Sequence, residues 1–262
     1  MSTPITAANT AILFDLAEPG IALITINRPE QRNAINTAVR EGLFEAFRRV
    51  EADPSIRVAI LTGAGDKAFC AGADLKEMSE MKLEVPPHGF FPVLGDGVEL
   101  TKPVIAAVNG VAFAGGFMFA QMCDLCVAST TARFAITEGK VGRGMPWSTP
   151  LIHMLPQRIM MELLLTGEAL AAERAYQVGL VNRLAEPEAL IDTALELARA
   201  IAACAPLTVA AAKATVRIAT EMGRSAALRS ADHAFDRVYR SKDAQEGPTA
   251  FREKRKPQWR GE

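Results

Sequence analysis

"AAVNGVAFAGGFMF", residues 106–119, is an apolar run of small residues that reaches a glycine pair and then continues with helical character. A second stretch, "LTGAGDKAFCAGADL" at 61–75, repeats this order: an apolar strand, a glycine-rich turn and the start of a helix. Such turns leave backbone N–H groups free. One N–H from each turn can bind the same oxygen, so the pair predicts an oxyanion hole. A phosphate-binding loop is the alternative, but neither GxGxxG nor GxxxxGK[ST] occurs.

Other apolar runs place these two turns in an α/β fold. The runs expected to form strands lie at 20–27, 57–63, 103–113, 124–129 and 132–137. Residues 34–50 place apolar side chains on one helical face, with Asn33 as the expected N-cap. From residue 157 onward, helical patterns follow one another. The alternation predicts repeated ββα-like turns in a core at 1–155, followed by a helical region at 156–262.

Composition excludes several classes of function. The chain has 262 residues, 49% hydrophobic, with a formal net charge of −1, and "REKRK" at 252–256 is its one dense basic cluster. This balance argues against nucleic-acid and anionic-membrane partners. No apolar run reaches membrane-spanning length. Residues 1–15 lack the basic and apolar regions of a secretory signal, so we expect a cytoplasmic protein.

The four cysteines form no disulfide framework. Cys123 and Cys126 are spaced as C-x₂-C, but no second cysteine or histidine pair follows, so we expect buried thiols and no metal. Residues 77–102 are irregular, with Phe90 and Phe91 at the centre. This segment is either a loop bordering a ligand or a plain surface connection.

Six segments, in order along the chain, resemble the enoyl-CoA hydratase/isomerase family, the crotonase superfamily: 27–35, 63–75, 102–116, 122–129, 163–184 and 250–259. The resemblance implies a crotonase-like spiral of ββα turns and C-terminal helices that build a homotrimer or a hexamer of two trimers. It also implies chemistry on an acyl-CoA thioester, whose enolate is stabilised by backbone N–H groups. Coenzyme A then enters as part of the substrate, and no separate cofactor is expected.

The same resemblance assigns roles to residues. The oxyanion donors would be the N–H groups of Ala71 and Gly115. The residues implied around coenzyme A are Arg28 and Arg32 near the phosphates, and Ala34, Ala73, Asp74 and Leu75 around the adenine and pantetheine. Phe251 and Lys254 would reach the coenzyme A of a neighbouring subunit. Solvated surface positions remain the alternative for Arg28, Arg32 and Lys254.

One position departs from the hydratase pattern. Hydratases of this family carry two glutamates; Glu138 matches the second, but Met118 stands at the first. No Asp or Glu lies between Asn109 and Cys123, so no shift of alignment restores it. Loss of one general acid or base costs a rate factor of about 10²–10⁴. A single glutamate can still shuttle one proton, as in enoyl-CoA isomerases. We therefore expect a double-bond isomerase or a slow hydratase.

Gly116 is expected to contact the substrate. Met118 and Trp147 are expected to line the acyl pocket, where desolvation would raise the pKa of Glu138. His153 is expected to be packed in an apolar stretch. Two alternatives stay open: a decarboxylase or hydrolase on the same fold, and a non-catalytic subunit that binds coenzyme A. An RNA-binding protein is disfavoured by the net charge.

Overall fold

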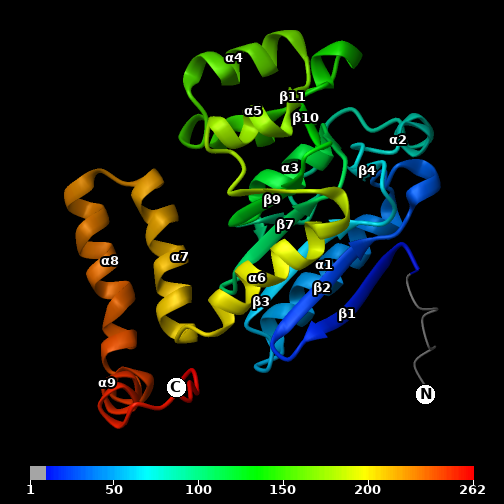
Figure 1. Ribbon diagram of the computed structural model, residues 1–262. Coiled ribbons are helices and arrows are strands. Elements are labelled where there is room, and N and C mark those ends of the chain that lie inside the picture. Colours follow the sequence, from blue (N-terminus) through cyan, green and yellow to red (C-terminus); the bar gives the residue numbers. More distant parts are fainter. Residues whose placement is uncertain (1–9) are drawn as a thin grey trace, which may run out of the picture.

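The computed structural model describes residues 10–262 and contains two principal β-sheets (Figure 1). The larger sheet has the order β1-β2-β3-β7-β9-β12. Its strands are β1 (Ile12–Glu18), β2 (Ile21–Ile26), β3 (Val58–Gly63), β7 (Val104–Val108), β9 (Leu125–Ser129) and β12 (Arg183–Ala185). All its neighbouring strands are parallel except β1 and β2. Parallel strands are buried on both faces, which explains their continuous apolar sequences.

The smaller sheet has the order β11-β10-β8-β4. Its strands are β4 (Ala68–Cys70), β8 (Val111–Phe113), β10 (Arg133–Ala135) and β11 (Leu170–Ala171); a separate pair is β5 (Val93–Leu94) and β6 (Gly97–Val98). Strands β4, β8 and β10 run parallel. The predicted strand at 103–113 is therefore two strands in different sheets. They separate at Asn109, whose side-chain amide donates to the Gly65 carbonyl at 2.7 Å.

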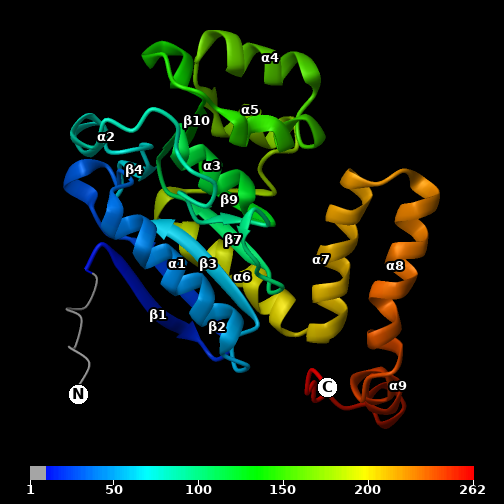
Figure 2. The same cartoon turned by 180° about the vertical axis from the view of Figure 1, so that it is seen from behind.

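Helices cover both faces of the larger sheet. The α-helices are α1 (Thr37–Ala52), α2 (Leu75–Met81), α3 (Gly115–Met122), α4 (Gln157–Thr166), α5 (Ala172–Gln177), α6 (Leu190–Ala202), α7 (Pro206–Glu221), α8 (Arg224–Tyr239) and α9 (Asp243–Glu253). The 3₁₀ helices are η1 (Pro29–Gln31), η2 (Glu138–Val141), η3 (Pro146–His153) and η4 (Pro187–Ala189). Helix α6 lies on one face and α1 on the other, as Figures 1 and 2 show from opposite sides. Each face has its own buried apolar cluster.

The N-cap of α1 is Asn36, whose side chain accepts from the Val39 N–H at 3.0 Å; the prediction of Asn33 was wrong. Asn33 is fully buried instead, and its amide donates to the carbonyls of Ala64 and Ala68. It thereby fastens the turn before α1 to the beginning of β4. A helix cap and a tertiary anchor use the same side-chain chemistry, so the sequence alone does not separate them.

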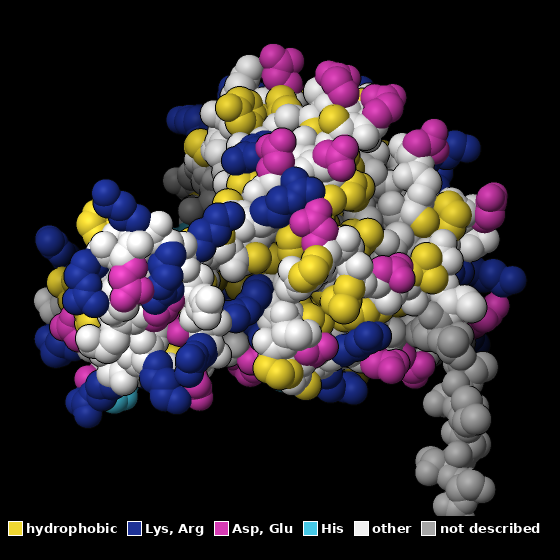
Figure 3. Space-filling view, turned by 60° about the horizontal axis from the view of Figure 1, so that its bottom comes forward, with side chains coloured by type: hydrophobic (Ala, Val, Ile, Leu, Met, Phe, Trp, Pro, Cys, Tyr) yellow, Lys and Arg dark blue, Asp and Glu magenta, His cyan; other side chains and the backbone are white. Residues whose placement is uncertain are grey.

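Helices α7, α8 and α9 project from the body of the molecule (Figures 1 and 2). Helix α8 buries none of its residues. In Figure 3, Lys and Arg side chains gather over this projecting part at the left. The predicted domain boundary at residue 155 does not coincide with the start of this projecting part. Strands β11 and β12 complete the two sheets, and α6 covers the larger one, so all three belong to the core. The core continues to about residue 202.

Within residues 10–262, no single helix has the length and apolar character that crossing a membrane requires. Two segments that meet at a bend of 108°, Pro187–Ala202 and Pro206–Glu221, satisfy the requirement only when taken together. The expected cytoplasmic localisation was argued from residues 1–15, and residues 1–9 of this stretch lie outside the described residues. Cys123 and Cys126 are buried free thiols, and burial raises the pKa of Cys126 to about 12.

Candidate active site

Three chain segments leave the smaller sheet at the carboxyl ends of its parallel strands. Residues 71–74 follow β4, residues 114–115 follow β8, and residues 137–138 follow β10. Because these strands are parallel, with Cys70 beside Ala112 and Phe113 beside Ala135, their carboxyl ends lie together. The crevice at the carboxyl ends of parallel strands is where α/β proteins place ligands. The fold therefore brings both glycine-rich turns and Glu138 to one place.

The two turns touch because their glycines have no Cβ. Gly72 has φ +98°, and a Cβ there would lie 2.9 Å from the Ala114 Cβ and 3.5 Å from the Gly115 nitrogen. A Cβ on Gly116 would overlap the Cys70 carbonyl oxygen. Gly116 therefore serves the packing of α3 against β4. It does not line the cavity, so the structure does not support the predicted contact of Gly116 with the substrate.

Ala73, not Ala71, has the free N–H of the first turn. The Ala71 N–H donates to the Arg32 carbonyl at 3.0 Å, so the predicted oxyanion role of Ala71 was wrong. Ala73 instead forms a parallel bridge with Ile35, in which Ile35 bonds to the residues on either side of Ala73. In this pattern the N–H of Ala73 faces away from Ile35.

Gly115 supplies the second free N–H. It is the first residue of α3, so its N–H has no intrahelical partner. A Cβ on Gly115 would lie 3.9 Å from the Ala73 nitrogen, so the backbone of Gly115 comes close to this second donor. The preceding residue, Ala114, has φ 49° and ψ −122°, a conformation that L-residues rarely adopt. Local backbone strain of this kind is typical of functional sites.

Glu138 is the buried carboxyl group of the site. It is 8% exposed; its Oε1 accepts from Trp147 Nε1 at 2.8 Å, and its Oε2 has no partner in the described structure. Burial raises the pKa of this carboxyl above its ordinary value, although the Trp147 hydrogen bond works in the opposite direction. The predicted direction of the pKa shift is confirmed.

Met118 and Gln121 face the same cavity from α3. Met118 is 2% exposed and carries no group that transfers protons. Gln121, one turn further along, is 7% exposed; its Nε2 donates to the Trp147 carbonyl at 2.8 Å, and its Oε1 has no partner in the described structure. The sequence analysis missed Gln121. A lone polar residue within the apolar run 117–122 was the available signal.

The cavity has a volume of about 1780 Å³. Besides the strand-end turns, its wall includes residues 84–91 and 93–96 of the irregular segment and part of α7. Of the two alternatives left open for this irregular segment, the structure favours a loop that borders the site over a plain surface connection. His153 is exposed and also lines the cavity, so its predicted packing was wrong. Among residues 10–262, no cluster of His, Cys, Asp and Glu has the arrangement of a metal site.

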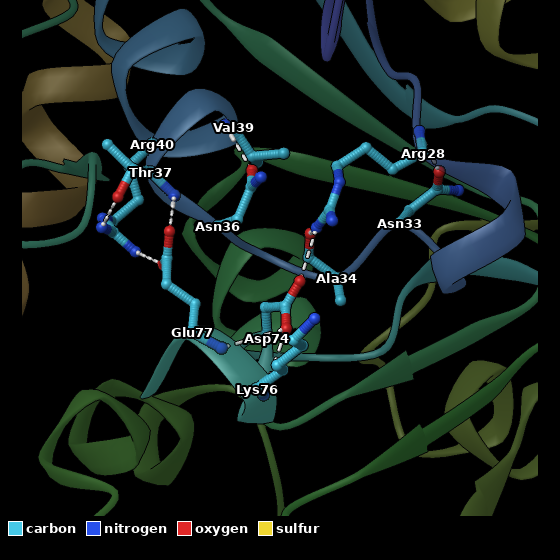
Figure 4. Close-up of polar contacts among 10 residues, drawn as sticks. All are labelled: Arg28, Asn33, Ala34, Asn36, Thr37, Val39, Arg40, Asp74, Lys76 and Glu77. Carbon is cyan, nitrogen blue, oxygen red and sulfur yellow. Dashed lines mark hydrogen bonds and ion pairs between the residues drawn. The ribbon is translucent and has the colours of Figure 1, made fainter. Parts of the chain in front are cut away.

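The residues expected to bind the acyl group or coenzyme A fall into three groups. Ala34, Ala73, Asp74, Leu75 and Trp147 line the cavity. Arg28 does not line it: its Nη1 donates to Asp74 Oδ2 at 3.0 Å and to the Ala34 carbonyl at 2.6 Å (Figure 4). Arg32 is exposed beside this network, and Phe251 and Lys254 are exposed at α9. Their contacts with phosphate, or with a neighbour's coenzyme A, stay predictions.

A family model described as Enoyl-CoA hydratase/isomerase matches residues 17–262. The chain belongs to this family. It is 42% identical over 253 residues to a carnitinyl-CoA dehydratase of Proteus mirabilis, covering 91% of this chain and 94% of the relative. It is 39% identical over 246 residues to an (E)-benzylidenesuccinyl-CoA hydratase of Thauera aromatica, and the match covers 92% of this chain and 96% of the relative.

A crystal structure of enoyl-CoA hydratase EchA1 from Mycobacterium marinum superimposes with a TM-score of 0.89, at 40% identity, over 97% of this chain and all of the other. The expected crotonase fold, with helices at its C-terminal end, is thereby confirmed. The chain is an enzyme of the enoyl-CoA hydratase/isomerase family that acts on acyl-CoA thioesters.

Proposed function

We propose that this enzyme moves a carbon–carbon double bond within an enoyl-CoA, with Glu138 as its single proton carrier. In a 3-enoyl thioester, Glu138 takes a proton from C2, and the electrons move onto the thioester oxygen to give a dienolate. The same carboxyl then returns a proton to C4, which leaves the double bond between C2 and C3. No water enters the product.

The environment of Glu138 carries this proposal. Other carboxylates line the cavity, among them Asp74, Asp124 and Glu221, but within residues 10–262 only Glu138 combines burial there with a pKa raised by desolvation. A carboxyl group with such a pKa both accepts and returns a proton readily. Trp147 holds only Oε1, and Oε2 has no partner among residues 10–262.

The N–H groups of Ala73 and Gly115 would stabilise the dienolate oxygen. They are fixed by the bridge to Ile35 and by the start of α3, so they need no reorganisation when charge develops. One donor in an oxyanion hole lowers the barrier by about 3–4 kcal/mol. Met118 meanwhile leaves α3 without the second carboxylate that would divide the work of adding water.

Hydration of a 2-enoyl-CoA, or the reverse dehydration, is the second candidate. The names of two relatives favour it, since they are a dehydratase and a hydratase of acyl-CoA substrates. In that reaction Glu138 alone would activate the water and deliver the proton. We then expect a rate about 10²–10⁴-fold below that of an enzyme with two carboxylates.

We further propose that the enzyme is cytoplasmic, needs no cofactor beyond the coenzyme A of its substrate, and assembles as a trimer or hexamer. Helix α8 buries none of its residues, and Phe251 on α9 is 87% exposed, which supports a subunit contact on this part of the chain. Light scattering after gel filtration measures the assembly; a monomer would contradict this part of the proposal.

The test of the reaction uses the purified enzyme in H₂¹⁸O with 3-hexenoyl-CoA and, separately, crotonyl-CoA. We expect 3-hexenoyl-CoA to become 2-hexenoyl-CoA without ¹⁸O, and crotonyl-CoA to take up ¹⁸O slowly. Rapid formation of ¹⁸O-labelled 3-hydroxybutyryl-CoA, with no isomerisation, would overturn the isomerase proposal in favour of the hydratase.

A further inference from the structure

Trp147 connects two parts of the site, the base Glu138 and helix α3, which must keep a fixed position relative to each other during the reaction. Its indole N–H donates to Glu138 Oε1 at 2.8 Å, while its own backbone carbonyl accepts from Gln121 Nε2 at 2.8 Å. Gln121 belongs to α3, the helix whose first residue, Gly115, presents an oxyanion donor. A chain of two hydrogen bonds thus joins the helix of the oxyanion hole to the base.

We propose that Trp147 is a positioning residue that holds one oxygen of the Glu138 carboxyl and leaves the other for the proton, and that Gln121 keeps Trp147 in place. The unpartnered atom assigns the working oxygen: Oε2 has no hydrogen bond in the described structure, whereas Oε1 is occupied. A carboxyl without such a contact rotates between two equivalent arrangements. The indole selects one of them.

The packing of Trp147 supports a fixed orientation of its indole. Its ring meets the fully buried Phe117 ring edge-on, at a centroid distance of 5.9 Å. Phe117 also belongs to α3, so the same helix holds the ring and the backbone of Trp147. Because both its ring and its backbone are held, Trp147 presents its indole N–H at a fixed position, which is the condition for positioning a catalytic group.

The indole also affects the charge on the base. Its N–H stabilises the carboxylate form and so opposes the rise in pKa that burial causes. Removal of the N–H therefore shifts the acid limb of the rate profile to higher pH, since the base works only when deprotonated. A residue that merely filled space would leave this limb unmoved.

This inference rests on the proposed role of Glu138, and its test has two readouts. Trp147 is replaced by phenylalanine and, separately, by benzothienylalanine, which keeps the ring shape but has no N–H. For both we expect kcat to fall about tenfold, KM to change little, and the acid limb to move upward. Trp259→Phe is the matched control, because its indole donates to the Ala203 carbonyl, outside the cavity; it should leave the profile unchanged.

Gln121→Met removes the second hydrogen bond of the chain. We expect a fall in kcat with little change in KM, and a smaller movement of the acid limb than in Trp147→Phe. Full kcat in Gln121→Met would overturn the role given to Gln121.

Titration of Glu138 by infrared difference spectroscopy, against Glu138→Gln in the same background, supplies the readout that needs no turnover. A raised pKa in the benzothienylalanine enzyme supports the positioning role, even if the wild type turns out to hydrate. If the wild type isomerises, and the benzothienylalanine enzyme has the same Glu138 pKa and the same kcat as the wild type, the positioning role is overturned and the proposed function stands.

Discussion

Met118→Glu tests whether the missing carboxylate is what limits hydration. Met118 is 2% exposed on α3 and lines the cavity together with Glu138. Glutamate has nearly the same length as methionine, so the substitution changes chemistry more than volume. It gives the site two carboxyl groups, one to activate water and one to deliver the proton.

The size of the effect follows from the burial of the position. A second acid or base contributes about 10²–10⁴ in rate, or roughly 3–5 kcal/mol of barrier. Two carboxyls in one desolvated cavity do not both ionise readily, so one stays protonated near neutral pH and serves as the acid. Placing a polar group in this apolar position costs about 1–3 kcal/mol of folding stability. The variant should therefore hydrate faster and melt at a lower temperature.

The assay is the initial rate at which crotonyl-CoA and H₂¹⁸O form ¹⁸O-labelled 3-hydroxybutyryl-CoA, with thermal unfolding measured alongside. Met118→Gln is the matched control, because glutamine is polar and as long as glutamate but has no group that acts as an acid or a base. We expect Met118→Glu to hydrate at least tenfold faster than Met118→Gln. A folded Met118→Glu enzyme that binds crotonyl-CoA and hydrates no faster than the control would refute the reasoning.

Three further predictions concern the base, the oxyanion hole and the packing of α3. The isomerisation rate should rise with pH through an apparent pKa above that of a free glutamate, because burial raises the pKa of Glu138 and the base must lose its proton; a rate profile falling over that range would contradict this. Ala73→Pro removes a free N–H and should lower kcat about 10²–10³-fold in a protein whose circular dichroism is unchanged; retained kcat would show that Ala73 is not a donor. Gly116→Ala forces a Cβ onto the Cys70 carbonyl and should cost about 1–3 kcal/mol in urea unfolding; wild-type stability would mean that α3 shifts freely.

The inner strands of the larger sheet could be predicted closely from the sequence, whereas its two outer strands, β1 and β12, were not predicted. The run 57–63 is β3 (Val58–Gly63) and the run 124–129 is β9 (Leu125–Ser129), because strands buried on both faces are apolar throughout. The run 103–113 was predicted as one strand, since its apolar character hardly breaks at Asn109. The separation there depends on side-chain bonds to residues 65 and 68, which are distant in sequence.

At the site, residues that act through their own side chains were easier to find than backbone donors. Glu138 was identified because it stands where the second glutamate of the resembling family does, and its buried position fits that assignment. The choice between Ala71 and Ala73 depends on which N–H is already used, and that depends on pairing with Arg32 and Ile35. The role of Trp147 was likewise hidden, because its partners come from two separate segments.

The most direct test of the account is the isomerisation rate of the Glu138→Gln enzyme with 3-hexenoyl-CoA. Glutamine keeps the shape of the side chain and its contact with the Trp147 indole, but it does not carry a proton between C2 and C4. We predict that kcat falls about 10²–10⁴-fold, while the affinity for the substrate is retained. A Glu138→Gln enzyme that isomerises at the wild-type rate would show that another group moves the proton.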